Sequence, residues 1–124
     1  MKRQVDKVDL TEILMKLQDI TGIKVYQDIC TDEDAEFYIT YIYQDERPAL
    51  CGNDEVLADK CAIYVNMYTP PSFDYFEYKK QIRNYLEKSG FKVASIATKV
   101  ETYDQDAKKI RRTTFDCEYA AFRD

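Results

Sequence analysis

The residues that could support a reaction in this chain are carboxylates, thiols and tyrosines, because its 124 residues include no histidine. Without an imidazole, the Ser-His and Cys-His pairs that activate a nucleophile cannot be assembled from this chain alone. The three glycines, Gly22, Gly52 and Gly90, are isolated, so the chain has neither a phosphate-binding P-loop nor a G-x-G-x-x-G turn. We therefore expect no catalytic residue and no cofactor.

The cysteines are the other candidate for chemistry, as metal ligands. Cys30, Cys51, Cys61 and Cys117 are widely separated and form no C-x-x-C pair. A zinc site would need all four to converge, so we interpret them as free thiols, with Cys61 and Cys117 as small core residues. The acidic segment 31–36 (TDEDAE) lacks the D-x-D-x-D-G spacing of a calcium loop. We expect a solvated loop there, and no metal site.

Charge and hydropathy limit the partners. The net charge is −5, and the largest basic cluster is the short group Lys108, Lys109, Arg111 and Arg112, so we expect no specific binding of nucleic acid. No stretch approaches the roughly 18 apolar residues of a membrane span. Lys2 and Arg3 are followed by polar residues instead of the apolar segment of a signal peptide. The expectation is a single domain, residues 1–124, made in the cytosol.

Eleven tyrosines without a tryptophan are the most unusual feature of the composition. Tyrosine has an apolar ring and a hydroxyl that can stay in water, and it is enriched at protein interfaces. The alternative is that many of these rings only cover the edge of the core. The first interpretation favours a subunit of an assembly.

The segment Val56–Tyr68 gives the strongest strand signal, since it is β-branched, aromatic and alternating from Cys61 onward. In a strand, residues 61, 63, 65 and 67 point to one face, and residues 62, 64, 66 and 68 point to the other. We expect this strand in the middle of the sheet, with a helix on its apolar face.

The other elements follow from periodicity and from turn residues. A helix begins near Asp9 and Glu12 with a capping-box pattern, has apolar residues at Leu10, Ile13, Leu14, Leu17 and Ile20, and ends at Gly22. A second helix is capped by Ser72 or Asp74, has an apolar face at Tyr75, Tyr78, Ile82, Tyr85 and Leu86, and ends at Gly90. The remaining predictions are a weak strand at 23–26, strands at 37–43, 91–101 and 110–122, and exposed loops at Gln44–Glu55 and Thr102–Lys109.

This order, α-β-β-β-α-β-β with a weak first strand, predicts an α+β fold. It is a mostly antiparallel sheet of about four main strands with two helices packed on one face.

The same residues carry a resemblance to a known family. The opening TEILMKLQDITGIKVYQD, then AEFYITYIYQDERPAL, NDEVLADKCAIYVNMYT and GFKVASIATKVETYD, resemble the small tail-terminator and tail-completion (head-tail joining) proteins of long-tailed bacteriophages and prophage-like elements. The likeness covers most of the chain from Leu10 to Phe122. It implies an α+β subunit that forms a ring, commonly of six copies, which caps the tail tube and contacts the tube protein and the head connector.

The resemblance implies a location and a contact surface, but no active-site residues. The protein would be found in the cytoplasm of the bacterial host during assembly, and then in the virion tail. The two long loops are the expected contact segments. The candidate assembly-interface residues on them are Asp45, Glu46, Arg47, Asn53, Tyr103, Asp104 and Lys108.

Two other functions are compatible with the sequence. One is another component of the neck between head and tail, which would differ from a terminator only in the ring that it binds. The other is a cytosolic small-ligand-binding domain or small enzyme that uses a carboxylate or a cysteine. A monomer with one deep pocket, holding such a group with a shifted pKa, would favour the last.

Overall fold

The computed structural model of the chain describes residues 7–32, 34–52, 55–102 and 109–122. This part of the chain contains three helices and five strands. In chain order they are α1 (Lys7–Met15), α2 (Leu17–Thr21), β1 (Val25–Gln27), β2 (Tyr38–Gly52), β3 (Glu55–Thr69), α3 (Phe76–Lys88), β4 (Lys92–Thr102) and β5 (Lys109–Phe122).

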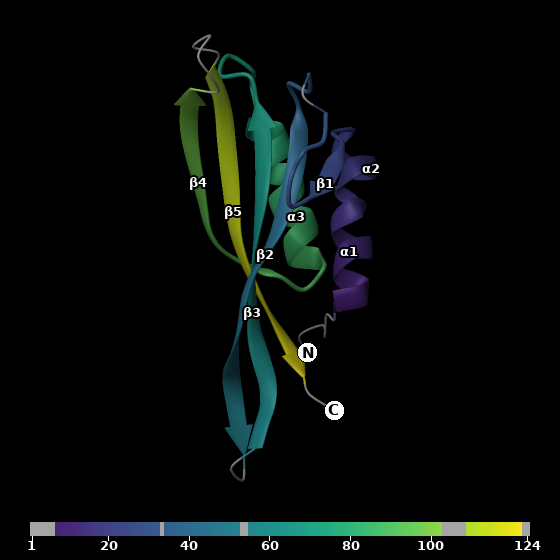
Figure 1. Ribbon diagram of the computed structural model, residues 1–124, viewed down its shortest axis with the longest axis vertical. Helices are drawn as coiled ribbons and strands as arrows, with labels where there is room; N and C mark the ends of the chain where they lie inside the picture. Colours follow the sequence, from purple (N-terminus) through teal and green to yellow (C-terminus); the bar gives the residue numbers. More distant parts are fainter. Residues whose placement is uncertain (1–6, 33, 53–54, 103–108, 123–124) are drawn as a thin grey trace.

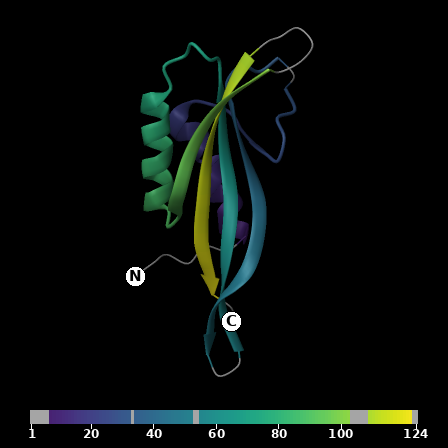
Figure 2. The same ribbon diagram turned by 90° about the vertical axis from the view of Figure 1, so that its left-hand side faces the viewer.

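The strands form one sheet in the order β1-β2-β3-β5-β4 (Figure 1). β1 is parallel to β2, and the other neighbouring pairs are antiparallel. In the side view of Figure 2, α3 stands on one side of the sheet, and apolar residues of α1 and α2 join those of α3 in one core cluster. The predicted α+β fold and its element order are confirmed, with β3 in the centre of the sheet.

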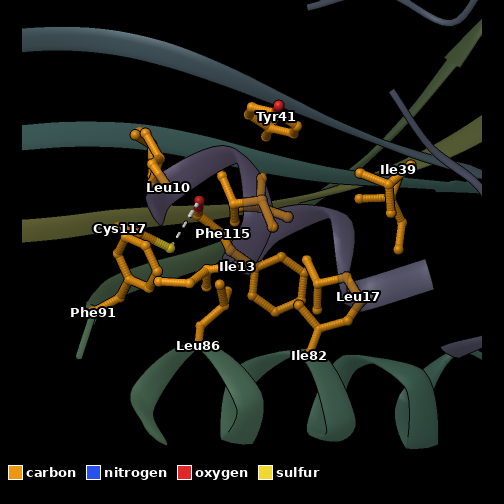
Figure 3. Close-up of a cluster of buried hydrophobic side chains, with 14 of the residues drawn as sticks. Leu10, Ile13, Leu17, Ile39, Tyr41, Ile82, Leu86, Phe91, Phe115 and Cys117 are labelled. Atoms are coloured by element: carbon orange, nitrogen blue, oxygen red, sulfur yellow. Dashed lines mark hydrogen bonds between the residues drawn. The ribbon is translucent and has the colours of Figure 1, made fainter. Parts of the chain in front are cut away.

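The core lies between the helices and one face of β2, β3 and β5 (Figure 3). Alternation along β3 decides which side chains enter it, because successive residues point to opposite faces. The predicted core residues of β3 and β5 have no exposed surface; they include Cys61, Ile63, Val65, Met67, Phe115 and Cys117. Ile82 and Leu86 of α3 are equally buried and point toward Phe115 and Ile13 in Figure 3.

The N-terminal helical segment differs from the predicted helix at both its start and its middle. α1 begins at Lys7, so Asp9 lies inside the helix and not at its cap, and the chain leaves the α-helix at Lys16 before α2 begins. The predicted apolar residues Leu10, Ile13, Leu14 and Leu17 are buried. Ile20 is 41% exposed, because α2 buries a face made by Leu17 and Thr21. Gly22 ends the segment with a φ of 73°, which glycine adopts without steric cost.

The largest difference from the sequence prediction is in the segment Gln44–Glu55, which is not an exposed loop. Antiparallel pairing of β2 with β3 continues from Asp45–Ala62 to Gly52–Glu55. Three register shifts, the first between Tyr43 and Asp45, accommodate the residues that break the alternation. A strand at the edge of a sheet also tolerates a proline such as Pro48. Residues 45–52 of β2 and residues 55–62 of β3 therefore continue the hairpin as an extension, the hairpin arm, whose end projects beyond the helices in Figure 1.

Two smaller predictions concern the second half of the chain. Strands β4 and β5 form the predicted antiparallel hairpin, whose tip, residues 103–108, lies outside the described residues. The helix α3 begins at Phe76 with Tyr75 in the N-cap position, so neither Ser72 nor Asp74 is the cap. Asp74 still contributes to this helix start, because its carboxylate accepts a hydrogen bond from the backbone N–H of Phe76 at 3.3 Å.

Candidate interaction surface

The predicted interface residues that the structure describes pair with the middle of β3, where Asp45, Glu46 and Arg47 lie opposite Ala62, Cys61 and Lys60. Asp45, Glu46 and Arg47 belong to β2, immediately after its first register shift, where the hairpin arm begins. The other four candidates, Asn53, Tyr103, Asp104 and Lys108, lie outside the described residues. Gly52 pairs with Glu55 at one end of β3, whereas Arg111 pairs with Thr69 at the other end. Ala62, which pairs with Asp45, is seven residues from Thr69 along β3, so at roughly 3.3 Å per residue Asp45 lies about 23 Å along the strands from the Arg111 end of the sheet.

Aromatic side chains gather at the Thr69 end of the sheet, which we call the aromatic end. Tyr38 and Tyr68, which are paired across β2 and β3, stack with ring centroids 4.4 Å apart. On the helix side, the rings of Phe37 and Phe73 make an edge contact at 4.9 Å. Phe73 also contacts Tyr78 of α3, at 5.5 Å. Such pairs contribute beyond the area they bury, so this end of the sheet is held together by rings from three separate segments.

A connection of six residues, 70–75, brings Phe73 and Tyr75 to the aromatic end. It begins with Pro70 and Pro71, which lack an N–H group and cannot continue the β3 ladder. Arg111 of β5 holds this connection in place. Its guanidinium donates hydrogen bonds to the carbonyl oxygens of Phe73, at 2.6 Å, and of Pro71. The same group lies over the Tyr75 ring, 4.3 Å from its centroid.

The corner of the aromatic end next to β4 exposes large apolar side chains. Phe76 is 66% exposed and stacks on Tyr75 at 4.9 Å. The hydroxyl of Tyr75 is 3.2 Å from Oγ1 of Thr98 in β4, and Val100, two residues further, is 50% exposed. Phe37, across the sheet, is 39% exposed. Grouped exposed apolar residues on a folded domain mark contact sites, and aromatic residues with arginine are typical of interfaces.

The face of the sheet away from the helices is polar on β5 and β4. Oδ1 of Asn66 in β3 accepts a hydrogen bond from the hydroxyl of Thr114 at 2.7 Å. Two ion pairs lie on this face, between Lys60 and Glu118 at 3.2 Å and between Arg112 and Glu101 at 2.9 Å. These are partly exposed pairs, each worth at most about 1 kcal/mol. They fix side chains of this face in defined positions without creating a reactive group.

The buried thiol of Cys117 is not activated. Burial in the core and, to a smaller extent, the negative charge of Asp116 raise the pKa of Cys117 from its ordinary value of 9.0 to about 12. A thiol with such a pKa is protonated at neutral pH and is a poor nucleophile. Cys61 is also buried, as predicted for both residues. Within the described residues, no three side chains of the histidine, cysteine or acidic type are placed to hold a metal ion.

The sequence pointed to tyrosine as the interface residue, but it did not single out the phenylalanines that complete the aromatic end. Phe37, Phe73 and Phe76 come from two segments that are far apart in the chain. A local signal was present in the sequence S-F-D-Y-F after two prolines, where three of five residues are aromatic. Its meaning depends on Phe37, which only the folded sheet brings next to it.

Comparison with known proteins does not assign the chain to a family. The chain matches no protein-family model and no curated protein sequence. In the described part of the chain, none of the helices combines the length and apolar character that crossing a membrane requires. The function of the chain must therefore be inferred from the surface at the aromatic end and from the resemblance of the sequence to tail-terminator proteins.

Proposed function

We propose that this chain is a structural subunit of a bacteriophage virion, of the tail-terminator or tail-completion type. In this function, copies of the chain form a ring on the head-proximal end of the tail tube, stop its growth and contact the head connector. The subunit would assemble in the cytoplasm of a bacterial host and remain in the virion tail.

The observation that carries the proposal is that two different candidate surfaces lie at opposite ends of one sheet. The aromatic end exposes Phe37 and Phe76, and the hairpin arm extends β2 and β3 beyond the helices at the other end (Figure 1). A subunit that joins a tube to a connector needs two such surfaces facing in opposite directions. A continuous central strand links them, so their spacing is set by the sheet.

The interior of the fold supports the same proposal, because it gives the sheet one well-packed face. The helices cover the face that carries Val65 and Phe115, both without exposed surface. The other face carries the ion pairs described above and the partly exposed ring of Tyr68, which stacks on the buried ring of Tyr38. Aromatic and ionic groups together suit a surface that is solvated in the free subunit and covered by another protein in the assembly.

The direct test is to disrupt the gene for this chain in its phage or prophage and to measure tails by electron microscopy. Loss of the terminator should give tails of uncontrolled length that do not join heads. Complementation with Phe37→Ser should fail to restore joining, whereas Ile20→Ser, which alters another partly exposed apolar residue, in α2, should restore it. Normal tails joined to heads after disruption would refute the proposal.

The partner that the chain binds would distinguish a terminator from another component of the neck. A terminator co-purifies with tube protein, whereas a connector-side component of the neck co-purifies with connector protein in the absence of tails. Purified protein can be mixed with each partner separately and examined by negative-stain microscopy for rings seated on tubes.

A further inference from the structure

The two edges of the sheet carry exposed apolar side chains within surroundings of opposite charge. At the β1 edge, Ile29 is 71% exposed and lies in the segment 28–37, which connects β1 to β2. The exposed carboxylates of Asp28, Asp32 and Asp34 are in the same segment. This acidic edge patch is defined as Asp28, Ile29, Asp32 and Asp34. Its one nearby described cation, Lys24, lies over the ring of Tyr26, 5.4 Å from the centroid.

At the opposite edge, Phe76 and Val100 are exposed on either side of Tyr75. The ammonium group of Lys79 is 5.9 Å from the centroids of both the Tyr75 and the Phe76 rings. We define the basic edge patch as Phe76, Lys79, Lys99 and Val100. Among the described residues, the lysines around it, Lys79, Lys80, Lys99 and Lys109, outnumber the acidic residues Asp74, Glu77 and Glu101.

The two patches are displaced from each other along the strands of the sheet. The backbone N–H of Asp28 donates to the carbonyl of Tyr41 at 2.9 Å. The row of paired residues that contains Tyr41 crosses the sheet through Val65 and Phe115 to Ile96. Val100 of the basic edge patch is four residues beyond Ile96, or about 13 Å along the strand. A second copy can therefore meet the first edge to edge with a displacement of about 13 Å along the strands.

The β4 edge favours a contact through side chains and not through backbone pairing. β4 is 11 residues long and pairs with β5, and in the described residues no strand lies on its other side. A register shift between Val93 and Ser95 and the exposed lysines Lys92 and Lys99 are features that discourage an edge strand from adding another strand. The exposed apolar side chains beside it remain available for docking.

We infer that the basic edge patch of one copy binds the acidic edge patch of a second copy of this chain. The contact is head-to-tail, because each copy uses a different patch on each side, and such contacts build rings or filaments. Phe76 and Val100 would be buried against Ile29, with the lysines facing the aspartates. The inference rests on the proposed function in one respect. A ring of identical subunits requires a head-to-tail contact between neighbouring copies.

The test uses two variants of the purified chain, each of which removes one patch. Phe76→Asp places an acidic group in the basic edge patch, and Ile29→Lys places a cation in the acidic edge patch. Both positions are exposed, so folding should be retained, and an aspartate is favourable at the start of a helix. Ile20→Asp, at an exposed apolar residue of α2, is the matched control for an added charge.

Self-association is measured by sedimentation velocity over a range of concentrations. Wild-type and Ile20→Asp proteins should associate, and each patch variant alone should associate at least about tenfold more weakly. An equimolar mixture of Phe76→Asp and Ile29→Lys should form a 1:1 dimer that does not grow, because one intact patch of each kind remains. A wild-type monomer up to about 1 mM, patch variants that associate like wild type, or a mixture that stays monomeric would each overturn the inference.

This measurement separates the contact from the proposed function. A 1:1 dimer in the mixture together with normal tails after gene disruption would leave the contact standing and refute the tail function. Rings on tail ends in micrographs, combined with a mixture that stays monomeric, would keep the function and overturn this contact.

Discussion

Replacing Arg111 with methionine should destabilise the protein and release the connection that carries Phe73 and Tyr75. Methionine keeps an unbranched apolar stem but cannot donate to the carbonyl oxygens of Phe73 and Pro71, and it loses the cation over the Tyr75 ring. Arg111 is only partly buried, so each of the two hydrogen bonds is worth about 1 kcal/mol, toward the low end for a charged donor. The cation–ring contact adds about 0.5–1 kcal/mol.

The sum predicts a loss of about 2–3 kcal/mol in the free energy of unfolding. For a domain of this size, each kcal/mol lowers the Tm by about 4 °C, so Arg111→Met should melt about 8–12 °C below the wild type. Besides lowering the global free energy of unfolding, the substitution should loosen the 70–75 connection locally. The N–H of Phe73 donates to the carbonyl of Pro70 at 3.1 Å, and its hydrogen exchange should accelerate in the variant more than exchange in β3.

The neighbouring arginine provides a matched control. Arg112 is on the same strand but on the opposite face of the sheet, where it pairs with Glu101 at 2.9 Å with both side chains about one-third exposed. Arg112→Met should therefore cost less than about 1 kcal/mol. Melting of Arg111→Met within about 2 °C of the wild type, or equal losses for the two variants, would refute the assigned role of Arg111.

Three further predictions follow from the core, the thiols and the hairpin arm. Val65→Asp places an unpaired charge where the wild-type side chain has no exposed surface; the subunit should unfold, and a native circular dichroism spectrum and melting transition would contradict this. The raised pKa of Cys117 means that the unfolded chain loses this proton at lower pH than the folded chain. Stability should thus fall between pH 9 and about 12 by up to roughly 1.4 kcal/mol per pH unit, and this part of the slope should vanish in Cys117→Ala. Arg47→Glu, in the hairpin arm, should leave the Tm unchanged but weaken assembly; variant protein that completes tails normally would remove the arm from the contact surface.

The strand pattern was predicted correctly where the apolar residues that alternate in the sequence are also the residues that are buried in the fold. β3 is recognisable because one face of it, with Ile63 and Val65, is apolar and the other is half-polar, and that alternation of residue types runs from Cys61 to Tyr68. The α3 face with Ile82 and Leu86 was predictable for the equivalent reason at a period of 3.6. Both cases need only local geometry.

The prediction of the hairpin arm failed because strand propensity is a poor guide at the edge of a sheet. The segment from Gln44 to Gly52 contains Pro48 and four charged or amide side chains in its first half, which together resemble a loop. Its strand conformation comes from cross-strand pairing with residues such as Ala58 and Ala62. Pairing of this kind is decided by the partner strand, and bulges absorb the irregular positions.

The sequence by itself determined the element order, the apolar faces of β3 and α3, and the burial of Cys61 and Cys117, because each follows from a short repeat of residue types. The tertiary structure alone decided that Phe37, Phe73 and Tyr75 meet at one end of the sheet. Their meeting depends on the register that aligns Tyr38 with Tyr68 and on Arg111, which reaches the 70–75 connection from β5. Contacts between residues 36 or more positions apart have no periodic signature in one sequence, since they arise when separate elements pack together.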